Sequence, residues 1–142
     1  MRKIILCLFL IFILTGCVSK DEYFTKTCTN KVKSGNLSVS EVKKITYNNK
    51  DEVTEVIVTK TYSDKSAKNI KAIKKASSDY NNELAASDDI LIKVVMDSEN
   101  KYSVQYTLDV QKLTSEELEM FNLEKNSIKL FKNYKNDDIS CK

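Results

Sequence analysis

Cysteine is the most reactive type of side chain in this 142-residue sequence, which contains four cysteines: Cys7, Cys17, Cys28 and Cys141. A cysteine thiol can be alkylated, can form a disulfide or can bind a metal as a thiolate. The sequence contains no histidine, which excludes Ser-His-Asp and Cys-His nucleophile systems and histidine-ligated zinc sites. It contains only two glycines, too few for a glycine-rich phosphate-binding loop.

Cys17 follows an apolar segment near the start of the sequence. Two basic residues at positions 2 and 3 precede eleven uninterrupted apolar residues, 4–14. This length fits the core of a secretory signal peptide and is too short for a membrane-spanning helix. The segment ends in Leu14-Thr15-Gly16-Cys17, which resembles the lipobox of bacterial lipoproteins. The resemblance implies that residues 1–16 are a signal peptide removed by cleavage between Gly16 and Cys17, and that the Cys17 thiol receives a diacylglyceryl group.

The lipobox predicts a location and a division of the chain. A lipid anchor on Cys17 would hold the protein on the extracytoplasmic face of a bacterial cell membrane, so the membrane is its first expected partner. Two acyl chains suffice for stable anchoring, whereas a single chain binds only marginally. We expect residues 17–27 to form the lipidated cysteine and a short tether, and residues 28–142 to form a single α+β domain.

Cys28 and Cys141 remain after the signal peptide is removed and Cys17 is lipidated. An even pair of cysteines in an exported chain predicts a disulfide. The alternatives are two free thiols or a metal site, but two cysteines without histidine are a poor ligand set for zinc. The disulfide is therefore the favoured interpretation.

No spacing identifies a catalytic residue, a metal ligand or a cofactor-binding residue. The adjacent carboxylates Asp88-Asp89 and Asp137-Asp138 are typical of solvated loops, and no serine–lysine pair is singled out as a nucleophile. Arg2 is the only arginine, so every cation after the signal peptide is a lysine, which cannot form the bidentate contacts that read carboxylates or guanine edges. We therefore expect no cofactor and no nucleic-acid partner.

The first half of the predicted domain is rich in strand patterns. Strands are predicted around 25–33, 39–47 and 52–62, with a turn at Ser34-Gly35-Asn36 and a hairpin between the second and third strands. The period then changes to that of a helix over 66–86. The apolar side of this helix is formed by Ile70, Ile73, Ser77, Tyr80 and Leu84, and the polar side by Lys68, Lys71, Lys75, Asp79 and Asn82.

The second half repeats the strand pattern. A continuous apolar strand is predicted at 90–96 and an alternating one at 102–110, whose apolar residues are expected in the core. Thr114 and Glu117 form the pattern of a capping box before a short helix that reaches Phe121. Residues 127–134 fit either a helix or a strand, and the helix is favoured. The resulting fold class is α+β: an antiparallel β-sheet with one long helix and short C-terminal helices packed on one face.

These features together resemble the YehR-type small bacterial lipoproteins: a lipobox, a first strand containing Thr27-Cys28-Thr29, two hairpins around one long helix, and a terminal Cys141-Lys142. The resemblance extends over the whole mature chain. It implies a compact α+β domain of unknown function on a lipid anchor, and it transfers no catalytic residue.

Two polar surfaces are candidates for contacts outside the chain. One is an uncovered face of the sheet, formed by Glu55, Thr59, Thr61, Ser103, Gln105 and Thr107. The other is a lysine row on the long helix (Lys68, Lys71 and Lys75), which is a candidate membrane-facing surface because each lysine near an anionic bilayer contributes about 1 kcal/mol. A solvated sheet face and a solvated helix face are the simpler interpretations.

Two functional hypotheses follow. The favoured one is a membrane-anchored extracytoplasmic lipoprotein with a non-enzymatic binding or envelope-associated domain, whose partner is an envelope or surface protein. The alternative is a minor cell-envelope hydrolase that uses carboxylate or Ser/Lys chemistry. A pocket with converging carboxylates would favour the hydrolase, and a closed core with a bare sheet face would favour the binding domain.

Overall fold

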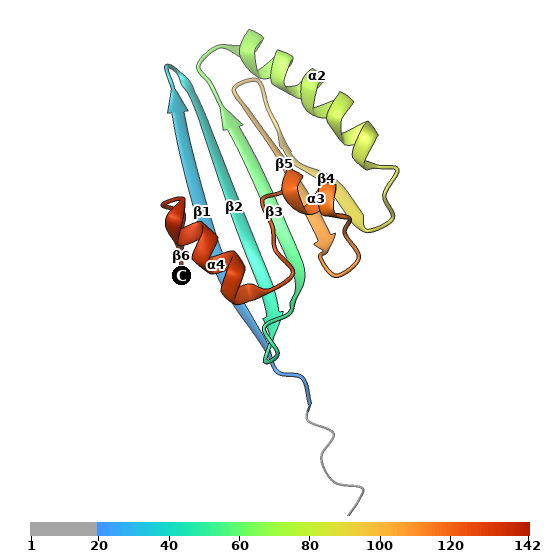
Figure 1. The fold of residues 1–142 in the computed structure, drawn as a ribbon. Coiled ribbons are helices and arrows are strands. Elements are labelled where there is room, and N and C mark those ends of the chain that lie inside the picture. Colours follow the sequence, from blue (N-terminus) through green and yellow to red (C-terminus); the bar gives the residue numbers. More distant parts are fainter. Residues whose placement is uncertain (1–19) are drawn as a thin grey trace, which may run out of the picture.

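Residues 20–142, which the computed structural model describes, form an antiparallel sheet with helices on one face (Figure 1). The strands follow the order β4-β5-β3-β2-β1-β6 across the sheet. Their bounds are β1 (Tyr23–Ser34), β2 (Leu37–Asn48), β3 (Val53–Ser63), β4 (Ile90–Asp97), β5 (Lys101–Asp109) and β6 (Ser140–Cys141). The three long N-terminal strands make two consecutive hairpins, and β5 lies between β3 and β4.

The hairpin turns have local causes. Gly35 joins β1 to β2 at a φ of 60°, a left-handed conformation that glycine adopts without steric cost. Between β2 and β3, the side-chain oxygen of Asn48 accepts hydrogen bonds from the backbone N–H groups of Lys50 and Glu52. Such a side chain replaces the backbone partner that a turn lacks.

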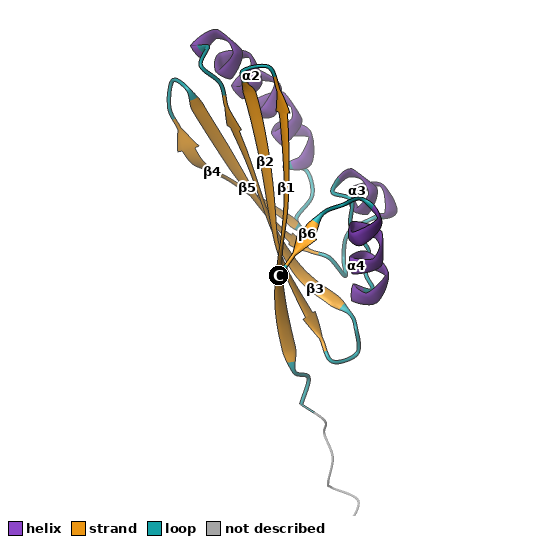
Figure 2. Cartoon of the chain, turned by 90° about the vertical axis from the view of Figure 1, so that its left-hand side faces the viewer, coloured by secondary structure: helices purple, strands orange, loops and turns teal. Residues whose placement is uncertain are grey.

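The helices are α2 (Ala67–Leu84), α3 (Ser115–Met120) and α4 (Ser127–Asn136). Figure 2 shows them on the same side of the twisted sheet. The capping box predicted from the sequence opens α3: the Thr114 hydroxyl accepts from the Glu117 N–H, and the Glu117 carboxylate accepts from the Thr114 N–H. The predicted fold class is confirmed, including the helix at residues 127–134.

The core lies between the sheet and these helices. Alternate residues of β3 and β5 face it, and Val56, Val58, Val104 and Leu108 are fully buried there. The helix α2 contributes Ile70 and Leu84. The strand residues one position away carry the polar side chains, because successive residues of a strand point to opposite faces.

Two features differ from the sequence prediction. The strand β1 begins at Tyr23, so residues 23–27 of the range 17–27 expected to be a tether belong to the sheet. The two-residue strand β6 was not predicted; it pairs Cys141 with Cys28 and Ser140 with Thr29 on the outer side of β1. Both differences arise from strand pairing, which a local pattern does not reveal.

Candidate functional site

The residues of the predicted lipobox, Leu14, Thr15, Gly16 and Cys17, lie outside the described residues. The structure therefore places neither the signal peptide nor the lipidation site. Within residues 20–142, no helix is long and apolar enough to cross a membrane.

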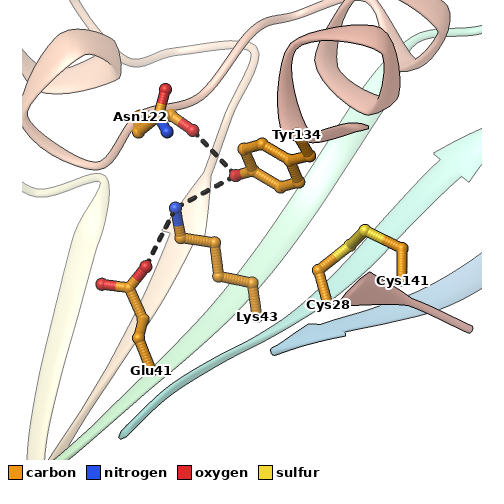
Figure 3. Close-up of a disulfide and its surroundings, with 6 residues drawn as sticks. All are labelled: Cys28, Glu41, Lys43, Asn122, Tyr134 and Cys141. Atoms are coloured by element: carbon orange, nitrogen blue, oxygen red, sulfur yellow. Dashed lines mark hydrogen bonds and ion pairs between the residues drawn. A yellow bond between two sulfur atoms is a disulfide. The ribbon is translucent and has the colours of Figure 1, made fainter. Parts of the chain in front are cut away.

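Cys28 and Cys141 form a disulfide, as predicted, with a Cα–Cα distance of 4.0 Å (Figure 3). Cys28 lies in β1 and is buried, and Cys141 lies in β6. Two backbone hydrogen bonds between Thr27 and Lys142, of 2.8 and 2.9 Å, continue the pairing beside the disulfide. The C-terminal end of the chain is thereby fixed to the outer side of β1.

A buried lysine, Lys43, lies next to the disulfide in the middle of the sheet, because Lys43 in β2 is the register partner of Cys28 in β1. Its side chain points to the helix-covered face, and the residue is 4% exposed. The ammonium donates to the Phe121 carbonyl at 2.7 Å and to the Tyr134 hydroxyl at 3.0 Å. It also pairs with the Glu41 carboxylate at 3.1 Å (Figure 3).

The three partners of Lys43 match the three donors of an ammonium group. Tyr134 in turn donates its hydroxyl proton to the Asn122 carbonyl at 2.7 Å. This polar centre, defined as Glu41, Lys43 and Tyr134 with the carbonyls of Phe121 and Asn122, connects β2 to α4 and to the segment after α3. Its ammonium is fully occupied by interactions within the chain, which gives Lys43 a structural role.

Burial determines the proton affinities of this centre. Desolvation lowers the pKa of Lys43, while the charge and hydrogen bond of Glu41 partly oppose that shift. Desolvation also raises the pKa of Tyr134, and the Glu41 charge adds to it. A lowered lysine pKa and a raised tyrosine pKa both reflect the cost of burying charge.

Sequence reasoning missed the polar centre, although a signal was present. In the predicted strand 39–47, Val39, Lys43, Ile45 and Tyr47 alternate with residues of the other face. Glu41 shares this face, so Lys43 occupies an inward-facing position between Glu41 and Ile45, which predicts a buried lysine that needs partners.

The lysine row has a defined place in the structure. Lys68, Lys71 and Lys75 are exposed and lie together on α2, as the helical period predicts. The helix begins after β3, at the end of the sheet opposite to the start of β1 (Figure 1). Contact of these lysines with a membrane is untested by the structure and stays a prediction.

The polar sheet face is also assembled as expected. Thr59 is opposite Gln105 and Thr61 is opposite Ser103, on the face without helices (Figure 2). The Thr61 and Ser103 hydroxyls are hydrogen-bonded at 2.9 Å. Ser103 is nevertheless buried, since its neighbours on adjacent strands cover it. The surface is therefore a hydroxyl-rich face with internal hydrogen bonds.

Two hollows are candidates for a ligand site. The first, of about 410 Å³, lies at one end of β3 and β5 and is bordered by Glu55, Asp88, Asp89, Asp109 and Lys112. Lys112 pairs with Asp109 at 2.8 Å and with Asp89 at 3.8 Å. Two of the carboxylates thus interact with the same cation. Among the described residues, no group of three or more acidic or cysteine side chains is placed to hold a metal ion.

The second hollow, of about 280 Å³, lies between α2 and the sheet and is bordered by Lys60, Tyr62, Ile73, Ala76, Ser77, Tyr80 and Tyr106. The Tyr106 hydroxyl donates to the Asn81 side chain at 2.9 Å, and burial raises the pKa of Tyr106. Tyr106 therefore acts as a hydrogen-bonding core residue, and Tyr102 and Tyr106 are both buried, as the sequence predicted.

Comparison with known proteins shows similarity at the level of the fold. No protein-family model matches the sequence, and no curated protein matches it. The structure is similar to the NMR structure of a protein from Streptococcus pneumoniae TIGR4, with a TM-score of 0.58 and 13% identity over 89% of each chain. At this identity the similarity extends to the fold alone.

Proposed function

We propose that the protein is a lipid-anchored extracytoplasmic lipoprotein whose domain has a non-enzymatic binding or envelope-associated role. The observation that carries the proposal is the sequence Leu14-Thr15-Gly16-Cys17 at the end of an eleven-residue apolar run. In this proposal Cys17 carries the lipid, and the domain beginning at Tyr23 is held next to the bacterial cell membrane.

The disulfide supports an extracytoplasmic location. Disulfides persist in exported proteins and are uncommon in the reducing cytosol. The Cys28–Cys141 bond joins strands that are already paired, and Cys28 is 1% exposed, so reductants have little access to its sulfur atom. The proposed compartment thus agrees with the cysteine chemistry of the domain.

The polar sheet face supports the binding role. Its threonine and glutamine side chains present hydrogen-bond donors and acceptors on the face opposite the helices. An envelope or surface protein is the partner class we propose for it. The hydrolase alternative gains no support from the carboxylate hollow, because Lys112 pairs with two of its acids.

Replacement of the lipidated cysteine tests the anchor. In the native host, Cys17→Ser should abolish incorporation of radiolabelled fatty acid and move the protein out of the detergent phase, or leave an unprocessed precursor. Cys7→Ser is the matched control, since it changes a cysteine of the predicted signal peptide itself and should leave labelling intact. Normal labelling of the Cys17→Ser protein would overturn the lipoprotein proposal.

A further inference from the structure

The end of the domain where β1 begins presents a cluster of apolar side chains. We name it the aromatic end and define it as Phe24, Tyr47, Ile128 and Phe131; Tyr23 lies at the same end of the sheet but points to the opposite face, because it is adjacent to Phe24 in β1. Phe24 is 45% exposed and Ile128 is 64% exposed. Large apolar side chains at this exposure are normal when scattered, but a group of them indicates a contact surface.

Ring contacts make the aromatic end continuous across three elements, β1, β2 and α4. The Phe24 and Tyr47 ring centroids are 5.7 Å apart, and those of Tyr47 and Phe131 are 5.5 Å apart. The Lys26 ammonium lies 4.6 Å from the Phe131 ring centroid. A lysine beside aromatic rings is the side-chain combination found where proteins meet the headgroup region of a bilayer.

The aromatic end is held rigidly at the point where the chain enters the sheet. The backbone N–H of Asn49 donates to the Glu22 carbonyl at 2.9 Å, and Lys50 pairs with Asp21 at 2.8 Å. The start of α4 is fixed to the same turn, because the Ser127 N–H donates to the Asp51 carbonyl at 2.8 Å. The entering chain, the β2–β3 turn and the start of α4 are thus joined.

We infer that the aromatic end is a membrane-contact surface that inserts into the headgroup region of the bilayer to which Cys17 is anchored. The inference rests on the proposed lipid anchor. Residues 17–23 span at most about 21 Å when fully extended. Any surface next to Tyr23 is therefore confined near the bilayer. A small movement of the domain then inserts the exposed aromatic and aliphatic side chains of this surface into the headgroup region.

This contact defines an end-on orientation. At about 3.3 Å per residue, the segment from Phe24 to Val32 spans about 26 Å. With the aromatic end in the headgroups, Val32 and the start of α2, which carries the lysine row, lie at the opposite end of the sheet, away from the bilayer (Figure 1). Membrane contact through the lysine row would instead require the helix-covered face to lie flat on the bilayer. The two orientations make different predictions for positions along β1.

Single-tryptophan variants distinguish these orientations, because the sequence contains no tryptophan of its own. The full-length lipidated protein is reconstituted in vesicles that contain brominated lipids. Phe24→Trp and Ile128→Trp place the probe in the aromatic end. Val32→Trp is the matched control: Val32 is 56% exposed and lies on the same face of the same strand as Phe24.

We expect quenching to be several-fold stronger at positions 24 and 128 than at position 32, with blue-shifted emission at the first two. Equal quenching at 24 and 32 would overturn the inference and favour the flat orientation. Absence of quenching at 24 and 128 in vesicle-bound protein would also overturn it, and intermolecular crosslinks there would assign the surface to a second copy. Failure of the lipidated chain to float with vesicles would refute the anchor itself.

Discussion

The helices α2 and α4 cover the same face of the sheet but are attached to it in different ways. The longer helix, α2, has 18 residues, of which Ile70 and Leu84 are buried, and its N-cap residue Ser66 makes no side-chain capping bond. The shorter helix, α4, has 10 residues, an Asn126 cap and three buried residues. Helix length is therefore a poor measure of how firmly a helix is attached.

Polar and covalent contacts account for the difference. Tyr134 in α4 takes part in the polar centre, and the chain after α4 ends in the disulfide to β1. By contrast, α2 is joined to β5 by the hydrogen bond between Tyr106 and Asn81 and by a weaker 3.4 Å contact between Ser77 and Tyr102. Its other polar contacts with the sheet come from the partly exposed Lys74, which donates to the Ser98 carbonyl at 2.8 Å and pairs with Asp97. We infer that α4 and β6 form the more stable part of the helical layer and α2 the less stable part.

Removal of the disulfide should cause the largest loss of stability, and it should make α4 less stable than α2. The bond closes a separation of 113 residues, which in the loop-entropy model corresponds to about 4–5 kcal/mol of stability. The Cys28→Ala/Cys141→Ala double variant should lose stability of that order in urea unfolding. In hydrogen exchange, amides of α4 should lose more protection than amides of α2. Equal losses in both helices would contradict the proposed difference in attachment.

The same contrast separates what the sequence could predict from what it could not. The helix α2 was predictable because its apolar positions repeat over many turns. In α4 the pattern is short, and Ile128 and Tyr134 fit helical and strand periods alike. The polar centre joins Lys43 to Tyr134, 91 residues away, and no local pattern encodes that contact.

β6 and the aromatic end illustrate the same limit. Two residues are too few to show a strand period, and β6 exists because Cys141 pairs with Cys28. Phe24 and Phe131 are both visible as apolar residues, but their meeting through Tyr47 depends on strand register and on the position of α4. The helices and the longer strands could thus be predicted from the sequence, whereas the contacts between their ends could not.

Tyr134→Phe should have the next largest effect, because it removes one hydroxyl from the polar centre. The change leaves the buried Lys43 ammonium with one partner fewer and the Asn122 carbonyl without its donor. Loss of a buried hydrogen-bond partner costs about 1–3 kcal/mol. The matched control is Tyr106→Phe, which removes the single bond to Asn81 and should cost less. A larger loss for Tyr106→Phe in urea unfolding would show that α2 is the more firmly attached helix.

The charge of Lys43 should have a smaller effect that depends on pH. Burial lowers the pKa of Lys43 in the folded protein below its ordinary value of 10.5. Between these two pKa values the unfolded chain binds more protons than the folded one, so stability rises with pH. The stability of the wild type relative to Lys43→Met should therefore increase on going from pH 7 towards about 9.5, below the range in which ordinary tyrosines ionise.

The comparison with Lys43→Met isolates this effect, because the other titrating groups are common to both proteins. Urea unfolding at several pH values gives the difference directly. A stability difference that stays constant over this range would contradict the prediction, because it would show that the pKa of Lys43 in the folded protein is not lowered into this range and that Glu41 offsets the cost of burial.

The smallest effect should come from the start of α2, where the charge distribution is unfavourable. Lys68 lies in the first turn of a helix that has no acidic residue there, so its charge is close to the positive end of the helix dipole. Lys68→Glu should stabilise the protein by about 0.3–1 kcal/mol at low ionic strength. Lys68→Gln is the matched intermediate and should give part of the gain. High salt should remove both gains, since Lys68 is exposed and its interactions are screened. Unchanged or lower stability of Lys68→Glu at low salt would show that the charge at the first turn of α2 does not weaken this helix. The weaker attachment of α2 would then be due to its small number of buried residues.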